Sequence, residues 1–599
     1  MPIPSPMTSL KLNVSTGISQ NAVTYEQDIS SSATIGNNSI QIMNQNLINA
    51  LNNQSMGTIF TPSVVATYAL PNSTNTYMVS VPSVSNYVPK PSVLRFEANG
   101  VTVKYLLPSI SSNSIPTFME ANIRQTGTEW FAVVNQSFKE TITNYANNDS
   151  EAIAIFTPPG QSSPVAFNNI VTTLMTDMSY MFYSSILFNQ PLNSWDVSKV
   201  INMQGMFSRC ASFNQPLNSW DVSNVTDMGG MFSNATAFNA PLNSWDVSSV
   251  TDMSYMFESS ILFNQPLNSW DVSSVTNMKY MFFNAIVFNA PLNSWDVSKV
   301  INMQGMFLLA NSFNGSINSW DVSSVTDMSF MLGGATVFNQ SINSWDVSSV
   351  MDMNYMFKSA EAFNQPLNLW DVSSVYNMSA MFADTKMFNQ SLNSWDVSSV
   401  EDMSYMFRNA ALFNQPLDSW DVSSVIYMAA MFRNAALFNQ PLNSWDVSSV
   451  EDMNNMFRDA KVFNQPLNMW DVLSLTNMSV MFSAADSFNQ PLNSWDVSSV
   501  TNMYGVFGNS KSFNQPLNTW DVSSVEDMSY MFYNTTIFNQ PLNLWDVSNV
   551  TNMDGMFYYA KAFNHDISNW DVNSVVSQPP VDFRNNSSLL LANSPLWVQ

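Results

Sequence analysis

The stretch 191–215 reads PLNSWDVSKVINMQGMFSRCASFNQ, and close copies of it follow one another for most of the chain. Trp195 is the first of sixteen tryptophans that recur every 25 residues, the last being Trp570. A fixed period of this size is typical of repeat proteins, in which one unit cannot bury its apolar face alone and must stack on its neighbours. The period therefore predicts a repeat solenoid rather than a series of separate globules.

Every copy places apolar residues at the same positions, which predicts continuous rows of identical side chains inside the stack. Leu192, Trp195 and Val197 have the L-x-x-L-x-L spacing of the strand in leucine-rich repeats. The segment Met203–Phe207 has the spacing of one face of a short helical turn. The sequence therefore predicts a leucine-rich-repeat type of coil, with a short parallel strand and a short helical turn. A right-handed β-helix accepts the same period and is the alternative fold. The expected core rows include Trp195, Trp220, Trp245, Trp270, Trp295, Phe207, Phe232 and Phe257.

Composition changes along the chain divide it into four predicted parts. They are a Ser- and Asn-rich arm or linker (1–90), a small α+β domain (91–165), the sixteen repeats (166–575) and a C-terminal cap (576–599). The dipeptide Asn99-Gly100 between alternating apolar residues predicts a β-hairpin. Further elements are expected from apolar spacing: strands near 118–123, 130–134 and 153–156, and helices near 40–51 and 138–145.

Composition and net charge argue against several classes of partner and of site. The formal net charge is −25, with 19 Lys and Arg against 44 Asp and Glu, which argues against nucleic acid because phosphate binding needs clustered positive charge. Cys210 is the only cysteine, so neither a disulfide framework nor a cysteine metal site is expected. The opening residues, MPIPSPMTSLKLNVSTG, have no basic segment before an apolar run, and no stretch of about 18 apolar residues occurs. No signal peptide, membrane span or cofactor is predicted.

The unit WDVSSVTDMSYMF (245–257), followed by FNQPLN (263–268), resembles the 25-residue repeat of BspA-like leucine-rich-repeat surface proteins. The resemblance covers about 400 of the 599 residues and includes both the period and the residue type at each position. It implies a solenoid of short parallel strands and a role in surface display, adhesion or partner binding. A cell-surface or virion location is likewise implied by the resemblance alone.

An aspartate follows each tryptophan, as in Asp196, Asp221, Asp246, Asp271 and Asp296. Stacked about 4.8 Å apart, such carboxylates repel one another and require compensation. One solution is internal, with hydrogen bonds from backbone N–H groups or from the serines two residues later. The other is a row of bound cations, of which Ca²⁺ suits hard oxygen ligands best. The asparagines of each F-N pair, such as Asn214, are expected to form a second row that holds loop backbone.

An enzyme needs a unique constellation of side chains, whereas this chain offers sixteen near-copies. His565 is the only histidine, and no unique nucleophilic residue accompanies it. Residues 91–165 contain no recognisable catalytic motif. Variation is concentrated after the Phe of each predicted helical turn, as in Lys358-Ser359 and Arg433-Asn434. The sequence therefore predicts a non-enzymatic repeat protein that binds a protein or glycan through many weak contacts. A structural spacer or self-assembling coat component is the alternative.

Overall fold

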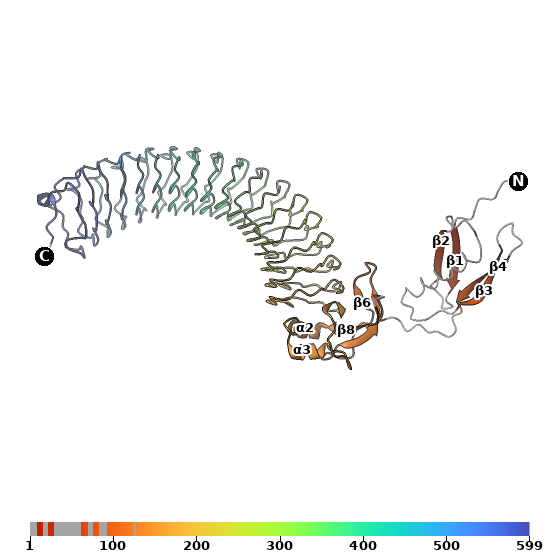
Figure 1. The fold of residues 1–599 in the computed structure, drawn as a ribbon. Coiled ribbons are helices and arrows are strands. Elements are labelled where there is room, and N and C mark those ends of the chain that lie inside the picture. The colour runs from red at the N-terminus through yellow and green to blue at the C-terminus, as the bar shows by residue number, and fades with distance from the viewer. Residues whose placement is uncertain are drawn as a thin grey trace, which may run out of the picture. The chain divides into compact units, whose positions relative to one another are not determined.

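The computed structural model describes residues 93–124 and 127–597 in full, together with the backbone of four N-terminal strands. These strands are β1 (Ser9–Ser15), β2 (Ala22–Asp28), β3 (Pro62–Ala69) and β4 (Thr76–Pro82). β1 pairs with β2 and β3 pairs with β4, both antiparallel (Figure 1). The helix expected near 40–51 lies outside the described residues.

The chain divides into two compact units. The first consists of Met1–Asn135, Pro158–Leu174 and Ser194–Asp196, and the second of Gln136–Thr157, Met175–Asn193 and Val197–Gln599. The first unit contains all the named strands, and the second contains two short α-helices and most of the repeat array.

Five further strands belong to the first unit. They are β5 (Leu94–Phe96), β6 (Val103–Tyr105), β7 (Thr117–Ala121), β8 (Glu129–Asn135) and β9 (Ile170–Leu174). β5 and β6 form an antiparallel hairpin, while β8 pairs antiparallel with β7 and parallel with β9. A short 3₁₀ helix, Phe167–Asn169, precedes β9. The strands expected near 118–123 and 130–134 are confirmed as β7 and β8.

The predicted hairpin at Asn99-Gly100 is confirmed, with shorter strands than expected. Gly100 has a φ of 70°, which a residue with a side chain adopts only at a cost. The Asn99 side-chain oxygen accepts hydrogen bonds from the N–H groups of Val101 and Thr102, each 3.0 Å long. These bonds extend the turn at the expense of strand pairing.

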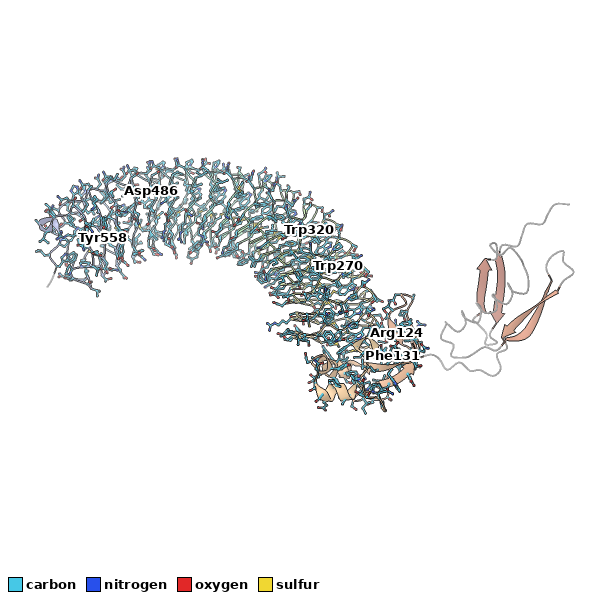
Figure 2. The ribbon with its side chains drawn as sticks, viewed as in Figure 1. Arg124, Phe131, Trp270, Trp320, Asp486 and Tyr558 are labelled. Atoms are coloured by element: carbon cyan, nitrogen blue, oxygen red, sulfur yellow. The ribbon has the colours of Figure 1, made fainter. Side chains whose placement is uncertain are left out.

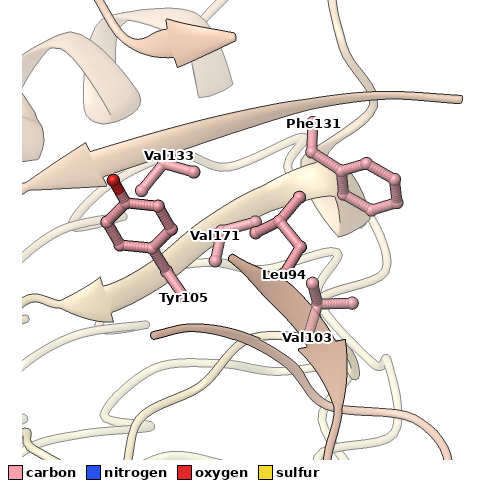
Figure 3. Close-up of a cluster of buried hydrophobic side chains, with 6 residues drawn as sticks. All are labelled: Leu94, Val103, Tyr105, Phe131, Val133 and Val171. Atoms are coloured by element: carbon pink, nitrogen blue, oxygen red, sulfur yellow. The ribbon is translucent and has the colours of Figure 1, made fainter. Parts of the chain in front are cut away.

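One cluster of buried side chains forms the core of this unit (Figure 3). It consists of Leu94, Val103, Tyr105, Phe131, Val133 and Val171. These residues come from the β5–β6 hairpin and from the two parallel-paired strands β8 and β9. The cluster therefore packs the hairpin against one side of the three-stranded sheet.

Helices of the second unit occupy residues between the strands and at the C-terminus. They are the 3₁₀ helices Gln136–Phe138 and Leu591–Asn593 and the α-helices α2 (Lys139–Ala146) and α3 (Ser150–Ile155). The helix expected at 138–145 is confirmed. The strand expected at 153–156 is wrong, because Asp149 starts a helix there by accepting a 2.9 Å hydrogen bond from the Ala152 N–H.

Each repeat contains one isolated parallel β-bridge in place of a regular strand. Fifteen such bridges join consecutive copies, beginning with Asp177 to Asn202 and Asn202 to Asp227. Alternate N–H groups of residues 203–209 donate to carbonyl oxygens of the next copy, as from Met203 to Asp227 at 2.9 Å. We call residues 201–209 and their counterparts the ladder. The strand expected at Leu192–Val197 is not formed, because inter-repeat backbone pairing takes place in the ladder instead.

The helical turn expected at Met203–Phe207 is also absent. The Met206 N–H donates to the Met203 carbonyl at 3.1 Å, and the Cys210 N–H donates to the Phe207 carbonyl at 3.0 Å. The third residue of each turn, Gly205 and Arg209, has a positive φ of 60° and 62°. These are two successive tight turns of type II character, which leave backbone N–H groups available for the neighbouring copy.

Aromatic rings form continuous rows between the copies. The ring centroids of Trp270 and Trp295 are 6.4 Å apart with planes inclined by 2°. Each indole N–H also donates to a backbone carbonyl, as from Trp320 to Leu292 at 3.0 Å. Trp270 and Trp320 mark this row in Figure 2. The row satisfies the buried indole N–H groups while burying large apolar surfaces.

The spacing of the copies differs across each repeat, and the row of repeats bends accordingly (Figure 1). Identical rings are separated by 6.4 Å at Trp245–Trp270 but by 5.6 Å at Phe257–Phe282, which lies in the ladder. Hydrogen-bonded neighbouring strands are about 4.8 Å apart. The ladder therefore lies on the inner side of the bend and the tryptophan row on the outer side.

Gln136 ends the ladder at the N-terminal side of the second unit. Its amide nitrogen donates to the Asp177 carbonyl at 2.7 Å, and its amide oxygen accepts from the N–H groups of Thr176 and Asp177 at 3.1 and 3.0 Å. A preceding repeat would contact the first copy through backbone groups of the same kind. The side-chain amide of Gln136 therefore replaces a missing peptide group.

Residues 581–585 end the ladder at the C-terminal side. The Gly555 N–H donates to the Val581 carbonyl and the Phe557 N–H donates to the Phe583 carbonyl, both at 2.8 Å. The Phe583 ring is buried and contacts Trp597 edge-on, with centroids 5.0 Å apart. Within the predicted cap, 576–599, Phe583 and Leu589 are buried, and Val581, Leu590 and Leu591 are exposed.

Candidate functional site

The aspartates that follow the tryptophans use their carboxylates within their own loops. Asp221 Oδ1 accepts from the Ser223 hydroxyl at 2.6 Å and from its N–H at 3.2 Å, and Asp246 bonds Ser248 in the same way. Hydrogen bonds from Ser273 and Ser298 lower the pKa of Asp271 and Asp296. The internal compensation predicted from sequence is thus present in these loops. Asp196 differs from these exposed residues because it is buried.

Cation binding along this row stays a prediction. Across the described residues, no three His, Cys, Asp or Glu side chains are grouped as a bound metal ion requires. In most of these loops one carboxylate oxygen is already engaged by the serine two residues later, as in Asp321 with Ser323. A cation would therefore bridge carboxylates of neighbouring repeats without further protein ligands.

A different row of carboxylates and amides, formed by the Asp and Asn residues of the β-bridges, was missed by sequence reasoning. Asp227 Oδ1 accepts from the Gly229 N–H at 2.8 Å, and Asn202 Oδ1 accepts from the Gln204 N–H at 2.9 Å. The signal was available, because nearly every copy has Asp or Asn immediately before the first ladder methionine. Each side chain closes the first ladder turn on its own backbone.

Burial makes this second row electrostatically different from the first. Desolvation raises the pKa of Asp227 and Asp352, and a neighbouring carboxylate, Asp252 or Asp327, adds to the shift. Asparagines interrupt the row so that no three aspartates are consecutive. The Asn277 amide also donates to Asp252 Oδ2 at 3.0 Å. Repulsion along the row is therefore limited by the residues themselves.

Tyr427 is the one departure from Asp and Asn among the bridge residues. Its side chain is 46% exposed. It has no oxygen placed to close the turn, and among the described residues no acceptor is present for the Ala429 N–H. This repeat therefore lacks the turn-closing bond of the other copies and has an exposed aromatic ring in its place.

Two ladder positions in every repeat have positive φ whatever residue occupies them. The position of Gly205 is taken elsewhere by Tyr255 and even by the β-branched Val480, whose φ is 49°. The Val480 N–H donates to the Tyr504 carbonyl of the next copy at 2.7 Å, and this bond favours a conformation that is otherwise costly for valine. Where glycine follows an aromatic copy, the ring covers it: a Cβ on Gly305 would lie 2.1 Å from the Tyr280 ring.

The variable segment comprises residues 208–212 and their counterparts, between the two phenylalanines of each repeat. It begins at the end of the ladder and contains the variable positions identified from sequence. Ion pairs join its members across repeats: Lys386 to Glu361 at 2.7 Å, Arg408 to Asp384 at 2.9 Å, and Lys511 to Asp486 at 3.0 Å. Its last position is often apolar and exposed, as in Leu262, Met387, Leu412, Leu437 and Ile537.

The remaining chemically reactive side chains are structural. Cys210 is buried, its thiol lies 2.8 Å from the Phe182 carbonyl, and burial raises its pKa to about 12. His565 lies 3.1 Å from the Asn539 carbonyl, at the position where most copies have glutamine. The predicted asparagine row is confirmed, since Asn214 Oδ1 accepts from the Asn239 N–H at 2.8 Å.

The repeats also match a known family. Five overlapping stretches fit the family described as "Mycoplasma protein of unknown function, DUF285": residues 160–261, 241–341, 315–419, 388–495 and 476–589. They extend over more than half of the chain. The chain belongs to the DUF285 family. Each DUF285 match spans about four of the 25-residue copies, so the family unit is itself a short stack.

Comparison with curated proteins gave no match for this DUF285 chain. Among the residues that the structure describes, no helix has the length and apolar character needed to cross a bilayer. The BspA-like resemblance stays a prediction, because the family model that fits the repeats has no assigned function.

Proposed function

We propose that this protein is a non-enzymatic repeat protein that binds a protein or glycan through the ladder and the variable segment. The observation that carries the proposal is the separation of constant from variable residues. Every copy keeps Trp-Asp-Val on the outer side of the bend, while several side chains in and after the ladder change from copy to copy beside the recurring methionines and phenylalanine. Partner recognition requires individual surface character on a rigid support, and this arrangement supplies both.

The support is rigid because each copy is held by its neighbours. Stacked rings and backbone hydrogen bonds recur at every step, so little conformational entropy remains to be lost on binding. Contacts of modest strength repeated along such a surface combine into high avidity. The −25 charge favours a partner that is neither nucleic acid nor an anionic membrane.

A non-enzymatic role is part of the proposal. The described residues offer repeated loops with serine-bonded carboxylates in place of one cleft with a distinct acid and base. The only thiol is buried with a raised pKa, which disfavours the nucleophilic thiolate.

The alternative, a self-assembling coat or spacer, is less well supported. End-to-end growth needs unpaired ladder ends, whereas Gln136 and residues 581–585 occupy the hydrogen-bonding groups of the terminal copies. Self-association would therefore have to be lateral.

The test removes whole copies without changing the register. Deleting 220–294 joins Ser219 to Trp295 and removes three complete periods. Binding of the full chain and of this variant is compared on a printed glycan array and a panel of purified surface proteins. We expect ligands of the full chain to bind the variant at least roughly tenfold more weakly, since avidity falls with the number of contacts. Equal binding by both chains, or purified chains that bind only each other, would refute the proposal.

A further inference from the structure

Three consecutive repeats carry an arginine at the first position of the variable segment. These are Arg408, Arg433 and Arg458. Each directly follows a ladder phenylalanine, and the rings of Phe407, Phe432 and Phe457 are 5.7 Å apart at both steps. The backbone positions of the arginines therefore follow one another at about this spacing. No other three consecutive copies have a charged residue at this position.

The row is compensated at its ends but not at its centre. Arg408 donates to Asp384 at 2.9 Å, and Arg458 lies 3.6 Å from Asp459. Arg433 has no carboxylate partner among the described residues; its neighbours at the next position are Asn409 and Asn434, which bond each other at 2.9 Å. Like charges about 6 Å apart repel by roughly 0.7 kcal/mol in water. A bound anion at the centre would relieve this repulsion.

An exposed apolar row accompanies the arginines in the same three repeats. Leu412, Leu437 and Val462 each stand four residues after an arginine and are 39%, 47% and 39% exposed. A purely anionic ligand would leave these aliphatic side chains in water. A ligand with acidic and apolar groups in alternation would use both rows.

Charge over the whole chain selects for a short ligand. Charges more than about 8 Å away are screened at physiological salt, so a short acidic segment responds to the three arginines and to the two carboxylates, Asp384 and Asp459, that pair with them. A long polyanion would extend over the rest of a protein of net charge −25. In an extended peptide, side chains on one side recur every ~6.7 Å, close enough to the row spacing for flexible arginines to reach three in succession.

We propose that Arg408, Arg433 and Arg458 bind a short, extended acidic segment of another protein. One carboxylate of the segment pairs with Arg433, and its neighbours approach Arg408 and Arg458, which keep their own carboxylate partners. The intervening apolar side chains contact Leu412, Leu437 and Val462. This inference rests on the proposed binding function and names the partner class for one part of the surface.

The test uses substitutions that the repeat itself contains. Serine occupies the arginine position in other copies, at Ser208, Ser233 and Ser483. The triple variant Arg408→Ser, Arg433→Ser, Arg458→Ser should therefore fold normally, which circular dichroism and thermal melting verify. A matched control, Lys199→Ser, Lys279→Ser, Lys299→Ser, makes the same charge change elsewhere, again at positions where other copies have serine.

The probe is a fluorescent peptide of alternating Glu and Leu, long enough to span three repeats, with a Gln-for-Glu version for comparison. We expect the full chain and the lysine control to bind it equally, and the arginine variant to bind roughly tenfold or more weakly. The Gln peptide should bind the full chain as weakly as the Glu peptide binds the arginine variant.

Two results would overturn the inference. One is equal peptide binding by the full chain and the arginine variant. The other is tighter, arginine-dependent binding of heparin or single-stranded DNA than of the peptide. Either could occur while ligands from the arrays still bind according to repeat number, so the broader proposal is judged separately.

Discussion

The tryptophan row and the ladder run through the same repeats but are maintained in different ways. On the outer side, Trp-Asp-Val is present in all sixteen copies, and each indole is held by rings and a carbonyl of neighbouring copies. On the inner side, backbone hydrogen bonds do the joining, and side chains as different as glycine, tyrosine and valine occupy one position. The outer side depends on side chains alone, whereas in the ladder, backbone bonds join the copies beside the stacked phenylalanines. The remaining ladder side chains are therefore free to vary and available for recognition.

The largest expected effect comes from removing a ring of the outer row. Trp320→Ala deletes a nearly buried indole that stacks at 6.3 and 6.4 Å on its two neighbours and donates to Leu292. We expect the free energy of unfolding of the surrounding repeats to fall by about 3–5 kcal/mol, the usual range when a large buried side chain is replaced by alanine. Hydrogen exchange followed by mass spectrometry should show lost protection in the copies on both sides.

Leu369→Ala is the control, because this residue adjoins Trp370 but is 69% exposed. The free energy of local opening measured by hydrogen exchange in this variant should stay within about 0.5 kcal/mol of the parent protein. Similar losses for both variants would contradict the dependence of the outer side on ring stacking.

On the ladder, two glycines with the same backbone conformation should respond differently. Gly305→Ala places a Cβ 2.1 Å from the Tyr280 ring, while a Cβ on Gly230 finds no atom closer than 3.8 Å. Both have positive φ, and alanine is accepted at this position in Ala380 and Ala430. We expect Gly305→Ala to cost roughly 1–2 kcal/mol more than Gly230→Ala, because Tyr280 must move. Thermal melting of both variants measures the difference.

Adding Tyr280→Gly to Gly305→Ala should restore most of the stability that Gly305→Ala loses. If it does not, the cost belongs to the backbone conformation and the ring contact is unimportant.

The smallest effects should have opposite signs in the two carboxylate rows. Hydrogen bonds from Ser348 lower the pKa of Asp346, whereas desolvation raises the pKa of Asp352. At neutral pH, Asp346→Asn should therefore destabilise its repeat and Asp352→Asn should stabilise its repeat, each by less than about 1 kcal/mol because solvent screens both groups.

The pH dependence follows from the same directions. The contribution of Asp346 is present above its unfolded-state pKa and is lost as pH falls through the lowered folded value. The penalty at Asp352 is absent below its unfolded-state pKa and develops as pH rises through the raised folded value. Both variants should approach the parent protein as pH falls below the ordinary aspartate range, which melting curves at several pH values can check. Effects of equal sign at pH 7 would show that the two rows do not differ as described.

Sequence reasoning located the repeat period and the asparagine row because both depend on residue identity at a fixed spacing. It placed the strand at Leu192–Val197 because that segment has the apolar spacing of a known strand motif. The structure puts pairing in the ladder instead, where the bridge residues are polar and the neighbouring positions vary. Polar Asp and Asn were missed there because their role is to close turns on their own backbone, and apolar periodicity does not report such bonds.

By itself, the sequence determined that copies of 25 residues repeat, with indoles and phenyl rings recurring at fixed positions. Periodic apolar residues can only be buried by neighbours with the same pattern, so that conclusion needed no coordinates. Only the tertiary structure decided which backbone segment pairs between copies, the positive φ at residues such as Val480, and the replacement of a missing repeat by Gln136. Each of these depends on hydrogen bonds between residues of different copies or distant segments, whose energy outweighs local conformational preference.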